Sequence, residues 1–274
     1  MDNIYTEHLW LAFALTLFAG LATGVGSAIA FFSRRTNTSF LCVALSFSAG
    51  VMLYVSFIEI FPKARIALTE GLGIQNGYYV TTLAFFAGIA LIALIDKLVP
   101  HRENPHEMHK VEDMETGGNT PHFHGLYRMG VLAALAIGLH NFPEGLATFI
   151  ATLQDPALGI PIAIAIALHN IPEGIAVSVP IYFATGSRMK AFLFSFVSGL
   201  AEPVGAVIGY LLIMPYLSDT LFGILFAMIA GIMVFISLDQ LLPAAQKYGK
   251  HHLSIYSLIV GMGVMAISLA LFVK

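Results

Sequence analysis

The sequence predicts an all-α polytopic membrane protein with eight transmembrane helices, and three observations support this fold class. Of the 274 residues, 58% are hydrophobic and 11% are charged, whereas soluble domains carry about 25% charged residues. The mean hydropathy is +0.83. Eight apolar runs reach the length of about 20 residues that a helix needs to cross a hydrocarbon core of ~30 Å. These predicted helices cover approximately residues 9–32, 40–62, 78–99, 128–150, 158–183, 190–214, 220–243 and 253–273.

The first predicted helix follows a short polar N-terminus and is too long for the apolar core of a signal peptide. We therefore interpret it as a retained span, and the chain, residues 1–274, as one transmembrane domain. The single cysteine, Cys42, excludes an intrachain disulfide and a cysteine metal cage. The net charge of −3 indicates no particular partner.

The distribution of Lys and Arg predicts that both termini lie outside the cytoplasm, because short cytoplasmic loops are enriched in these residues. In that orientation the outer face holds only Lys63, Arg65 and Lys274. The odd-numbered connections, which are then cytoplasmic, hold Arg34, Arg35, Lys97, Arg102, Lys110, Arg128, Arg188, Lys190, Lys247 and Lys250.

One connection is long, at residues 97–125 between the third and fourth predicted helices. It is polar, contains Pro and Gly and has no helical periodicity, so we expect a cytoplasmic loop. Half of the ten histidines lie there: His101, His106, His109, His122 and His124. Imidazole is a common ligand for zinc and related metals. Weak, exchangeable metal binding and chance histidines in a solvated loop are both open alternatives.

The sequence contains internal repeats. Residues 49–64 align without gaps to residues 230–245, and residues 22–31 match residues 201–210. The first two predicted helices thus recur as the sixth and seventh, and the third and eighth form a fainter pair. Five helices separate each one from its copy, and an odd offset reverses its direction across the membrane. Such inverted repeats are typical of secondary transporters, whose sites lie near the bilayer midplane.

A hexapeptide also occurs twice, as HNFPEG at 140–145 and HNIPEG at 169–174. The two copies lie in the fourth and fifth predicted helices, which are consecutive and therefore antiparallel. They form a second inverted pair between the two flanking triplets. The predicted arrangement is 3 + 2 + 3.

The residues of each hexapeptide suit a buried metal. His and Glu four residues apart share one helix face, and charged side chains inside a membrane normally mark a pathway. Pro143 and Pro172 free the carbonyls of Leu139 and Leu168, the asparagines add oxygens, and the glycines allow close helix approach. Imidazole and carboxylate suit zinc or ferrous iron.

Glu202 lies inside the sixth predicted helix, at the repeat position of Thr23, so only one repeat carries an acid there. We add Glu202 to the site because an acid inside an apolar span is itself a functional candidate. The candidate metal ligands are His140, Asn141, Glu144, His169, Asn170, Glu173 and Glu202.

Other interpretations remain. N-x-P-E resembles the start of a helix, and His–Glu pairs can be structural. An intramembrane zinc hydrolase also needs buried His and acid residues, but its usual H-E-x-x-H motif is absent. A metal sensor would need a large ligand-binding or signalling domain, and the sequence contains none. The sequence also lacks the phosphate-binding motif G-x-x-x-x-G-K-[ST], so direct use of ATP is not expected. The roles of Glu59, Asp239 and Gln240 near the ends of the second and seventh predicted helices are open.

The sequence resembles the ZIP (Zrt-, Irt-like protein) family of metal transporters, most closely its bacterial branch, over nearly the whole chain. The resemblance rests on LHNFPEG at 139–145, ALHNIPEG at 167–174, SGLAEP at 198–203 and the proline-containing second and seventh predicted helices. It implies uptake of Zn²⁺, with Fe²⁺, Mn²⁺, Co²⁺ or Cd²⁺ as further substrates, into the cytoplasm by alternating access. It also implies a location in the plasma (bacterial inner) membrane.

The resemblance further implies a binuclear site. One metal would use His140, Glu144, His169 and Glu173 in some combination; the second would use Asn141, Glu144, Asn170, Glu173 and Glu202, with the two glutamates bridging. The sequence does not divide the histidines between the two positions. Two departures from the family pattern are Gln240, where an acid is expected, and Pro203, where another residue is expected.

The expected partners follow from the same resemblance. They are divalent metal ions, carried as substrate rather than as a catalytic cofactor, and membrane lipid; a homodimer is an open expectation. We expect no nucleic acid or nucleotide partner and no enzymatic activity.

Overall fold

The computed structural model describes residues 8–32, 38–98, 121–216, 218–248 and 251–272, and these are helical apart from short connections. The α-helices are α2 (Leu9–Phe32), α3 (Thr38–Val55), α4 (Phe61–Leu72), α5 (Ile74–Leu98), α6 (Pro121–Gln154), α7 (Pro156–Thr185), α8 (Arg188–Gly199), α9 (Ala201–Ile208), α10 (Asp219–Phe235), α11 (Leu242–Tyr248) and α12 (His251–Phe272). Short π-helices are η1 (Ser56–Ile60), η4 (Gly209–Ile213) and η6 (Ile236–Leu241), and η5 (Met214–Tyr216) is a 3₁₀ turn.

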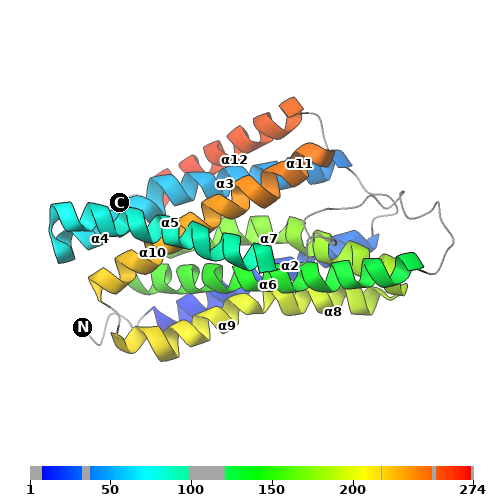
Figure 1. Ribbon diagram of the computed structural model, residues 1–274, viewed down its shortest axis with the longest axis horizontal. Coiled ribbons are helices and arrows are strands. Elements are labelled where there is room, and N and C mark those ends of the chain that lie inside the picture. The colour runs from blue at the N-terminus through cyan, green and yellow to red at the C-terminus, as the bar shows by residue number, and fades with distance from the viewer. Residues whose placement is uncertain (1–7, 33–37, 99–120, 217, 249–250, 273–274) are drawn as a thin grey trace.

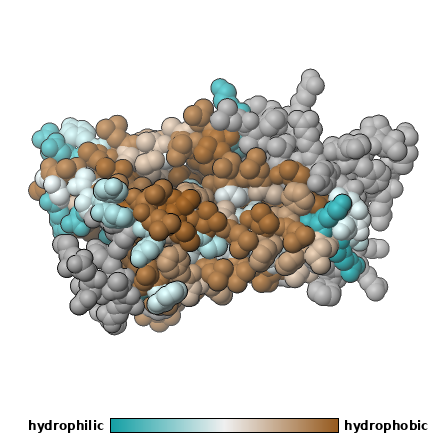
Figure 2. Space-filling model, turned by 90° about the horizontal axis from the view of Figure 1, so that it is seen from below, coloured by the Kyte–Doolittle hydropathy of each residue, from teal (hydrophilic) through white to brown (hydrophobic). Residues whose placement is uncertain are grey.

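These elements form eight long segments that run roughly along the long axis of the molecule (Figure 1). Among the described residues, seven segments are long and apolar enough to cross a membrane. The eighth, α6, has 34 residues, more than the about 20 that a span needs. Figure 2 shows apolar residues over the middle of one face and polar residues toward its two ends. The chain is therefore a multi-pass, all-α membrane protein, as the sequence predicts.

Several predicted boundaries are wrong, mainly around prolines. The second predicted helix continues past Pro62 to Leu72, and the seventh continues past Pro243 to Tyr248. A π-helix ends just before each proline, which then lies in the first turn of the next helix, where a missing N–H is tolerated. The sixth predicted helix is interrupted by a turn at Leu200, two residues before Glu202.

The predicted loop at 97–125 is too long at both ends. Residues 97 and 98 belong to α5, and α6 begins at Pro121. The fourth predicted helix, 128–150, is accordingly too short. The central part of this loop lies outside the described residues.

Backbone contacts at glycines confirm the inverted repeats. At each of these positions a side chain would collide with a carbonyl of a neighbouring helix, so the helices touch there. The contacts occur in equivalent pairs: Gly26 with Ile171 and Gly205 with Phe142; Gly50 with Leu258 and Gly231 with Phe85; Gly88 with Met228 and Gly261 with Phe47. The last two pairs also confirm that α5 and α12 correspond, the pair that was faint in sequence.

The helices fall into two packed groups. α2, α6, α7, α8 and α9 pack together, whereas α3, α4 and α5 pack with α10, α11 and α12. In Figure 1 the first group occupies the lower half of the view and the second the upper half. α7 and α3 provide one of the contacts between the groups. The hexapeptides therefore lie in the first group, next to its border with the second.

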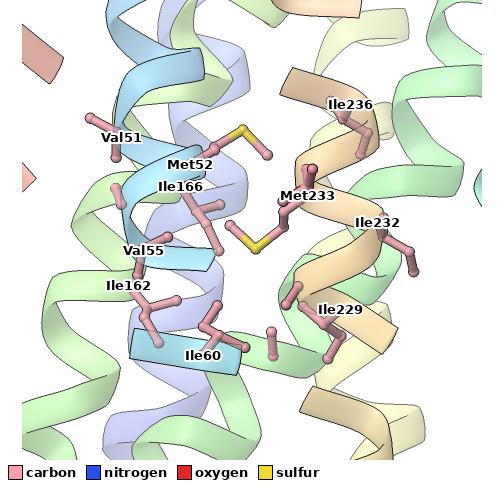
Figure 3. Packing of buried hydrophobic residues seen from close by; sticks show 14 of the residues in the cluster. Val51, Met52, Val55, Ile60, Ile162, Ile166, Ile229, Ile232, Met233 and Ile236 are labelled. Atoms are coloured by element: carbon pink, nitrogen blue, oxygen red, sulfur yellow. The ribbon is translucent and has the colours of Figure 1, made fainter. Parts of the chain in front are cut away.

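A buried apolar cluster fills this border. Figure 3 shows Met52 of α3 and Met233 of α10 pointing into the space between their helices, with Ile162 and Ile166 of α7 beside them. Met52 and Met233 are repeat equivalents, and all four side chains are buried. The two repeats thus contribute equivalent residues to one packed core.

Candidate metal site

The two hexapeptides lie within continuous helices. α6 passes through Pro143, and α7 runs from Pro156 to Thr185 without a break at Pro172. The interpretation of N-x-P-E as a helix start is therefore wrong. Within a continuous helix, His and Glu four residues apart project from the same face, as the sequence predicts.

Six of the seven candidate ligands are brought together in the protein interior. They come from three helices: Asn141 and Glu144 from α6, His169, Asn170 and Glu173 from α7, and Glu202 from the first turn of α9. None of the six is more than 4% exposed. Groups of this kind are almost never fully buried without partners, so their contacts decide what they can do.

The His169 ring lies between two carboxylates. Its Nε2 is 2.9 Å from Glu144 Oε2, and its Nδ1 is 3.3 Å from Glu173 Oε1. The first contact joins the two hexapeptide helices, and the second spans one turn of α7. The imidazole thus links one glutamate of each hexapeptide.

The two asparagines anchor the hexapeptides to α8 and α2 in equivalent ways. Asn141 Nδ2 donates to the carbonyl of Ser198 at 3.3 Å, and Asn170 Nδ2 donates to the carbonyl of Ala19 at 2.8 Å. Ala19 and Ser198 are repeat equivalents. Asn170 Nδ2 also donates to Glu202 Oε1, a bond that has no counterpart at Asn141 because Thr23 stands in the place of Glu202.

Several buried oxygens in this cluster have no hydrogen-bond donor within the described part of the chain. They are Asn141 Oδ1, Glu144 Oε1, Asn170 Oδ1 and Glu202 Oε2. Buried polar groups normally find partners, and leaving one without a partner costs about 1–3 kcal/mol. Amide and carboxylate oxygens without donors have lone pairs available for a cation.

The charges around Glu202 also favour the binding of a cation. The described groups that interact with the charge of Glu202 are Glu144, Glu173 and His169, and no Lys or Arg is among them. Several carboxylates close together in a buried site repel one another and are poorly solvated. A divalent cation would offset both effects.

The ligands do not form a ready-made cage. Within the described ranges, no three His, Cys, Asp or Glu side chains are arranged so that they would hold a metal ion. The two nitrogens of His169 face different carboxylates. A cation that binds His169 must therefore replace at least one His–Glu contact.

The glycines of the hexapeptides make the close helix contacts that the sequence predicts. A side chain at Gly145 would collide with the backbone of Glu202, and one at Gly174 would collide with the carbonyl of Thr23. Each close approach brings a residue of α9 or α2 beside the glutamate that precedes the glycine.

The remaining histidine predictions are not tested. His140 lies in α6, but its side chain is outside the described residues, as are those of His122 and His124 in the first turn of the same helix. His101, His106 and His109 lie outside the described residues altogether. Metal binding by these histidines stays a prediction.

Sequence reasoning missed the carbonyls of Ala19 and Ser198, which hold the asparagines. Neither residue type indicates a role in the site by itself, and only the repeat alignment relates the two positions to each other. Of the residues left open, Glu59 pairs with Lys63 at 2.9 Å, and Gln240 is buried in η6. Pro203 lies in the first turn of α9, where proline is tolerated.

Comparison with known proteins places the chain in a family. The family model described as ZIP zinc transporter matches residues 7–269. The protein named zinc transporter ZupT from Nitratidesulfovibrio vulgaris is 65% identical over 272 residues, which cover 97% of this chain and 98% of the relative. A zinc transporter ZupT from Lysinibacillus sphaericus is 64% identical, and one from Streptococcus mutans is 60% identical; they cover 97% and 98% of this chain and 99% and 100% of their own lengths. By these matches, the chain belongs to the ZIP zinc transporter family.

Proposed function

We propose that this protein imports divalent zinc across the plasma membrane through the buried cluster on α6, α7 and α9. The relatives are named zinc transporters. The observation that carries the proposal is the His169 ring between Glu144 and Glu173, with Glu202 as a further acid nearby. This cluster lies at the centre of the inverted repeats, where secondary transporters bind their substrates.

Two adjacent metal positions fit the donors. His169, Glu144 and Glu173, together with His140, offer imidazole and carboxylate, which zinc accepts. Asn141, Asn170 and Glu202 offer oxygens only, and the two central glutamates are able to bridge the positions. Mixed donors of this kind also suit Fe²⁺, Mn²⁺, Co²⁺ and Cd²⁺ as further substrates.

We propose that zinc enters through a cavity of about 280 Å³ at one end of the molecule. Its lining includes Glu70, Asp155 and Asp219, whereas Lys63 is its only described base and pairs with Glu59. Acidic mouths concentrate cations. With both termini outside the cytoplasm, as the distribution of Lys and Arg predicts, this mouth faces outward.

An ion that enters this cavity meets an apolar barrier before it reaches the cluster. Leu158 of α7 lines the cavity, and Ile162 and Ile166 lie one and two turns further along the same helix, fully buried. His169 follows. Because a hydrated ion cannot pass through packed side chains, we propose alternating access, in which the two helix groups shift against each other and open one side at a time.

The direct test is uptake of radiolabelled Zn²⁺ into proteoliposomes. Glu144→Ala and Glu173→Ala should each lower uptake at least about 100-fold, because each removes a ligand rather than a supporting group. Glu59→Gln is the matched control, because Gln240 is the natural residue at the equivalent position of the other repeat. It should transport like the parent. A parent protein that moves no divalent metal would refute the function, and folded alanine variants with parental uptake would refute the site.

A structural role for the His169–Glu144 pair is the competing interpretation. It is tested by the melting temperature of the purified protein with and without Zn²⁺. Ligand that binds the folded state raises the melting temperature. We expect zinc to stabilise the parent but not Glu144→Ala. If zinc stabilises neither protein, the pair is structural only.

The hydrolase alternative is not supported by the relatives, whose names describe transporters. The histidine loop is proposed to receive ions on the cytoplasmic side. Deletion of residues 103–120 should therefore change the rate of zinc uptake without abolishing it, and complete loss in a folded deletion variant would contradict this role.

A further inference from the structure

α2 carries a threonine at the position that Glu202 occupies in the other repeat. Ala19, Gly20 and Thr23 of α2 correspond to Ser198, Gly199 and Glu202, and the equivalent contacts of the glycines and asparagines establish this correspondence in space. Glu202 is one of the candidate ligands. The role of Thr23 at the equivalent place is therefore a question of the same site.

The hydroxyl of Thr23 is in an unusual state for a buried helical threonine. It is fully buried, and its Oγ1 has no hydrogen-bond partner among the described residues. Helical threonines usually donate to a carbonyl of the preceding turn, as Thr16 of the same helix does to Ala12 at 2.8 Å. The hydroxyl of Thr23 is thus available to a group outside its own helix.

The contacts of Thr23 place it beside the candidate metal ligands. Its carbonyl lies against Gly174, next to Glu173, in the same way that the backbone of Glu202 lies against Gly145. A side chain at Gly199 would come within 2.8 Å of Thr23 Oγ1, so the hydroxyl lies at the crossing of α2 and α8.

The repeat symmetry pairs Thr23 with Asn141, because their equivalents, Glu202 and Asn170, are joined by a hydrogen bond across the site. Asn141 Oδ1 also lacks a donor within the described ranges. Threonine ends two bonds earlier than glutamate, and its oxygen is therefore set back from the place that the carboxylate of Glu202 reaches.

We propose that the Thr23 hydroxyl is an oxygen donor to the metal position formed by Asn141, Asn170 and Glu202, directly or through one bound water. This inference rests on the proposed function. With Glu144 and Glu173 as bridging groups, Thr23 brings the number of oxygen donors at this position to six. It is thereby a specificity-determining residue.

The chemistry of six oxygens predicts which metal depends most on Thr23. Mn²⁺ prefers an octahedral shell of oxygen ligands, whereas Zn²⁺ is satisfied with four ligands and accepts nitrogen readily. Loss of one neutral oxygen should therefore weaken Mn²⁺ binding more than Zn²⁺ binding.

The test compares Thr23→Val, which replaces the hydroxyl with a methyl group of similar size, with Thr23→Ser, which keeps a hydroxyl. Thr16→Val is the matched control, because it removes a buried hydroxyl from the same helix that is already bonded within that helix. Metal affinity of the purified protein is measured by calorimetry for Mn²⁺ and Zn²⁺, and uptake of both is measured in proteoliposomes. Thr23→Val should lower Mn²⁺ affinity about tenfold and Zn²⁺ affinity clearly less. Thr23→Ser and Thr16→Val should keep the parental ratio of the two affinities.

Three outcomes would overturn the inference: a parental ratio of Mn²⁺ to Zn²⁺ affinity in Thr23→Val, the same change in Thr16→Val, or no Mn²⁺ binding by the parent. If Thr23→Val does not fold, Thr23→Cys provides the second test. A thiol favours soft ions, so this variant should bind Cd²⁺ better relative to Mn²⁺ than the parent does, and an unchanged ratio overturns the inference. A parent that transports zinc while Thr23→Val changes nothing leaves the proposed function intact, whereas a parent that transports no metal refutes the function itself.

Discussion

The contact of α6 with α9 and the contact of α7 with α2 have the same backbone geometry but different side-chain chemistry. In both, a hexapeptide glycine touches the backbone of the neighbouring helix. Asn141 of α6 donates to the carbonyl of Ser198 in α8, the helix before α9, and Asn170 of α7 donates to the carbonyl of Ala19 in α2. Only one contact includes an acid, Glu202; the other includes Thr23. The repeat symmetry thus sets where the helices meet, and single substitutions within it set what the site binds.

Removal of the charge of Glu144 or Glu173 should lower zinc uptake more than any other change. Glu144→Gln and Glu173→Gln keep the shape of the side chain but remove a carboxylate that both metal positions are proposed to share. Zinc uptake should fall at least about 100-fold in each, measured as initial rate in proteoliposomes. Glu202→Gln affects only one position, so its uptake should fall less, by about tenfold. Equal losses in all three variants would contradict the proposed sharing.

Collision at the glycine contacts should destabilise the fold. Gly145→Val and Gly174→Val force a side chain against neighbouring backbone, and overpacking of this kind costs about 1–3 kcal/mol or more. Both variants should melt at lower temperature, by similar amounts if the two contacts are equivalent. Gly263→Ala is the control, because a Cβ at this exposed position meets nothing within 4 Å. If the melting temperature falls in only one of the two valine variants, the two contacts do not contribute equally to stability, although their backbone geometry is equivalent.

The asparagines should separate the two halves of the site. Asn141 and Asn170 make equivalent bonds to Ser198 and Ala19, but Asn170 also donates to Glu202. Asn170→Ala therefore loses one hydrogen bond more than Asn141→Ala, a difference in stability of about 0.5–1.5 kcal/mol. The melting temperature of the metal-free protein should be lower in Asn170→Ala. The reverse order would contradict the role given to Glu202.

The smallest effect on zinc uptake is expected at the acidic cavity lined by Glu70, Asp155 and Asp219, which lies far from the candidate ligands. Neutralisation of Glu70, Asp155 and Asp219 to Gln or Asn removes long-range attraction but no ligand of the cluster. Zinc uptake at low ionic strength should slow by about two- to threefold, and added salt should remove the difference, because exposed charges are screened beyond about 10 Å at 0.1 M. A loss that persists at high salt would instead indicate direct metal binding at the mouth.

Much of this protein was predictable from sequence because a membrane imposes simple constraints. Apolar runs predict the spans, and the two hexapeptides predict the ligand faces. The predicted helices that end at Pro62 and Pro243 were too short, because a π-helix before each proline places it in the first turn of a further helix, where its missing N–H is tolerated. The sequence does not reveal these π-helices. The faint relation of α5 to α12 became clear only from the contacts of Gly88 and Gly261.

The sequence by itself determined the all-α membrane fold, the inverted repeats and the identity of the buried His, Asn and Glu residues, because hydropathy, helical spacing and internal similarity are local properties of the chain. Only the tertiary structure decided that His169 lies between Glu144 and Glu173, that Asn170 reaches Glu202, and that the buried Thr23 hydroxyl has no hydrogen-bond partner among the described residues. These contacts join residues from helices far apart in the sequence, and the close approach of helices at the glycines brings them together.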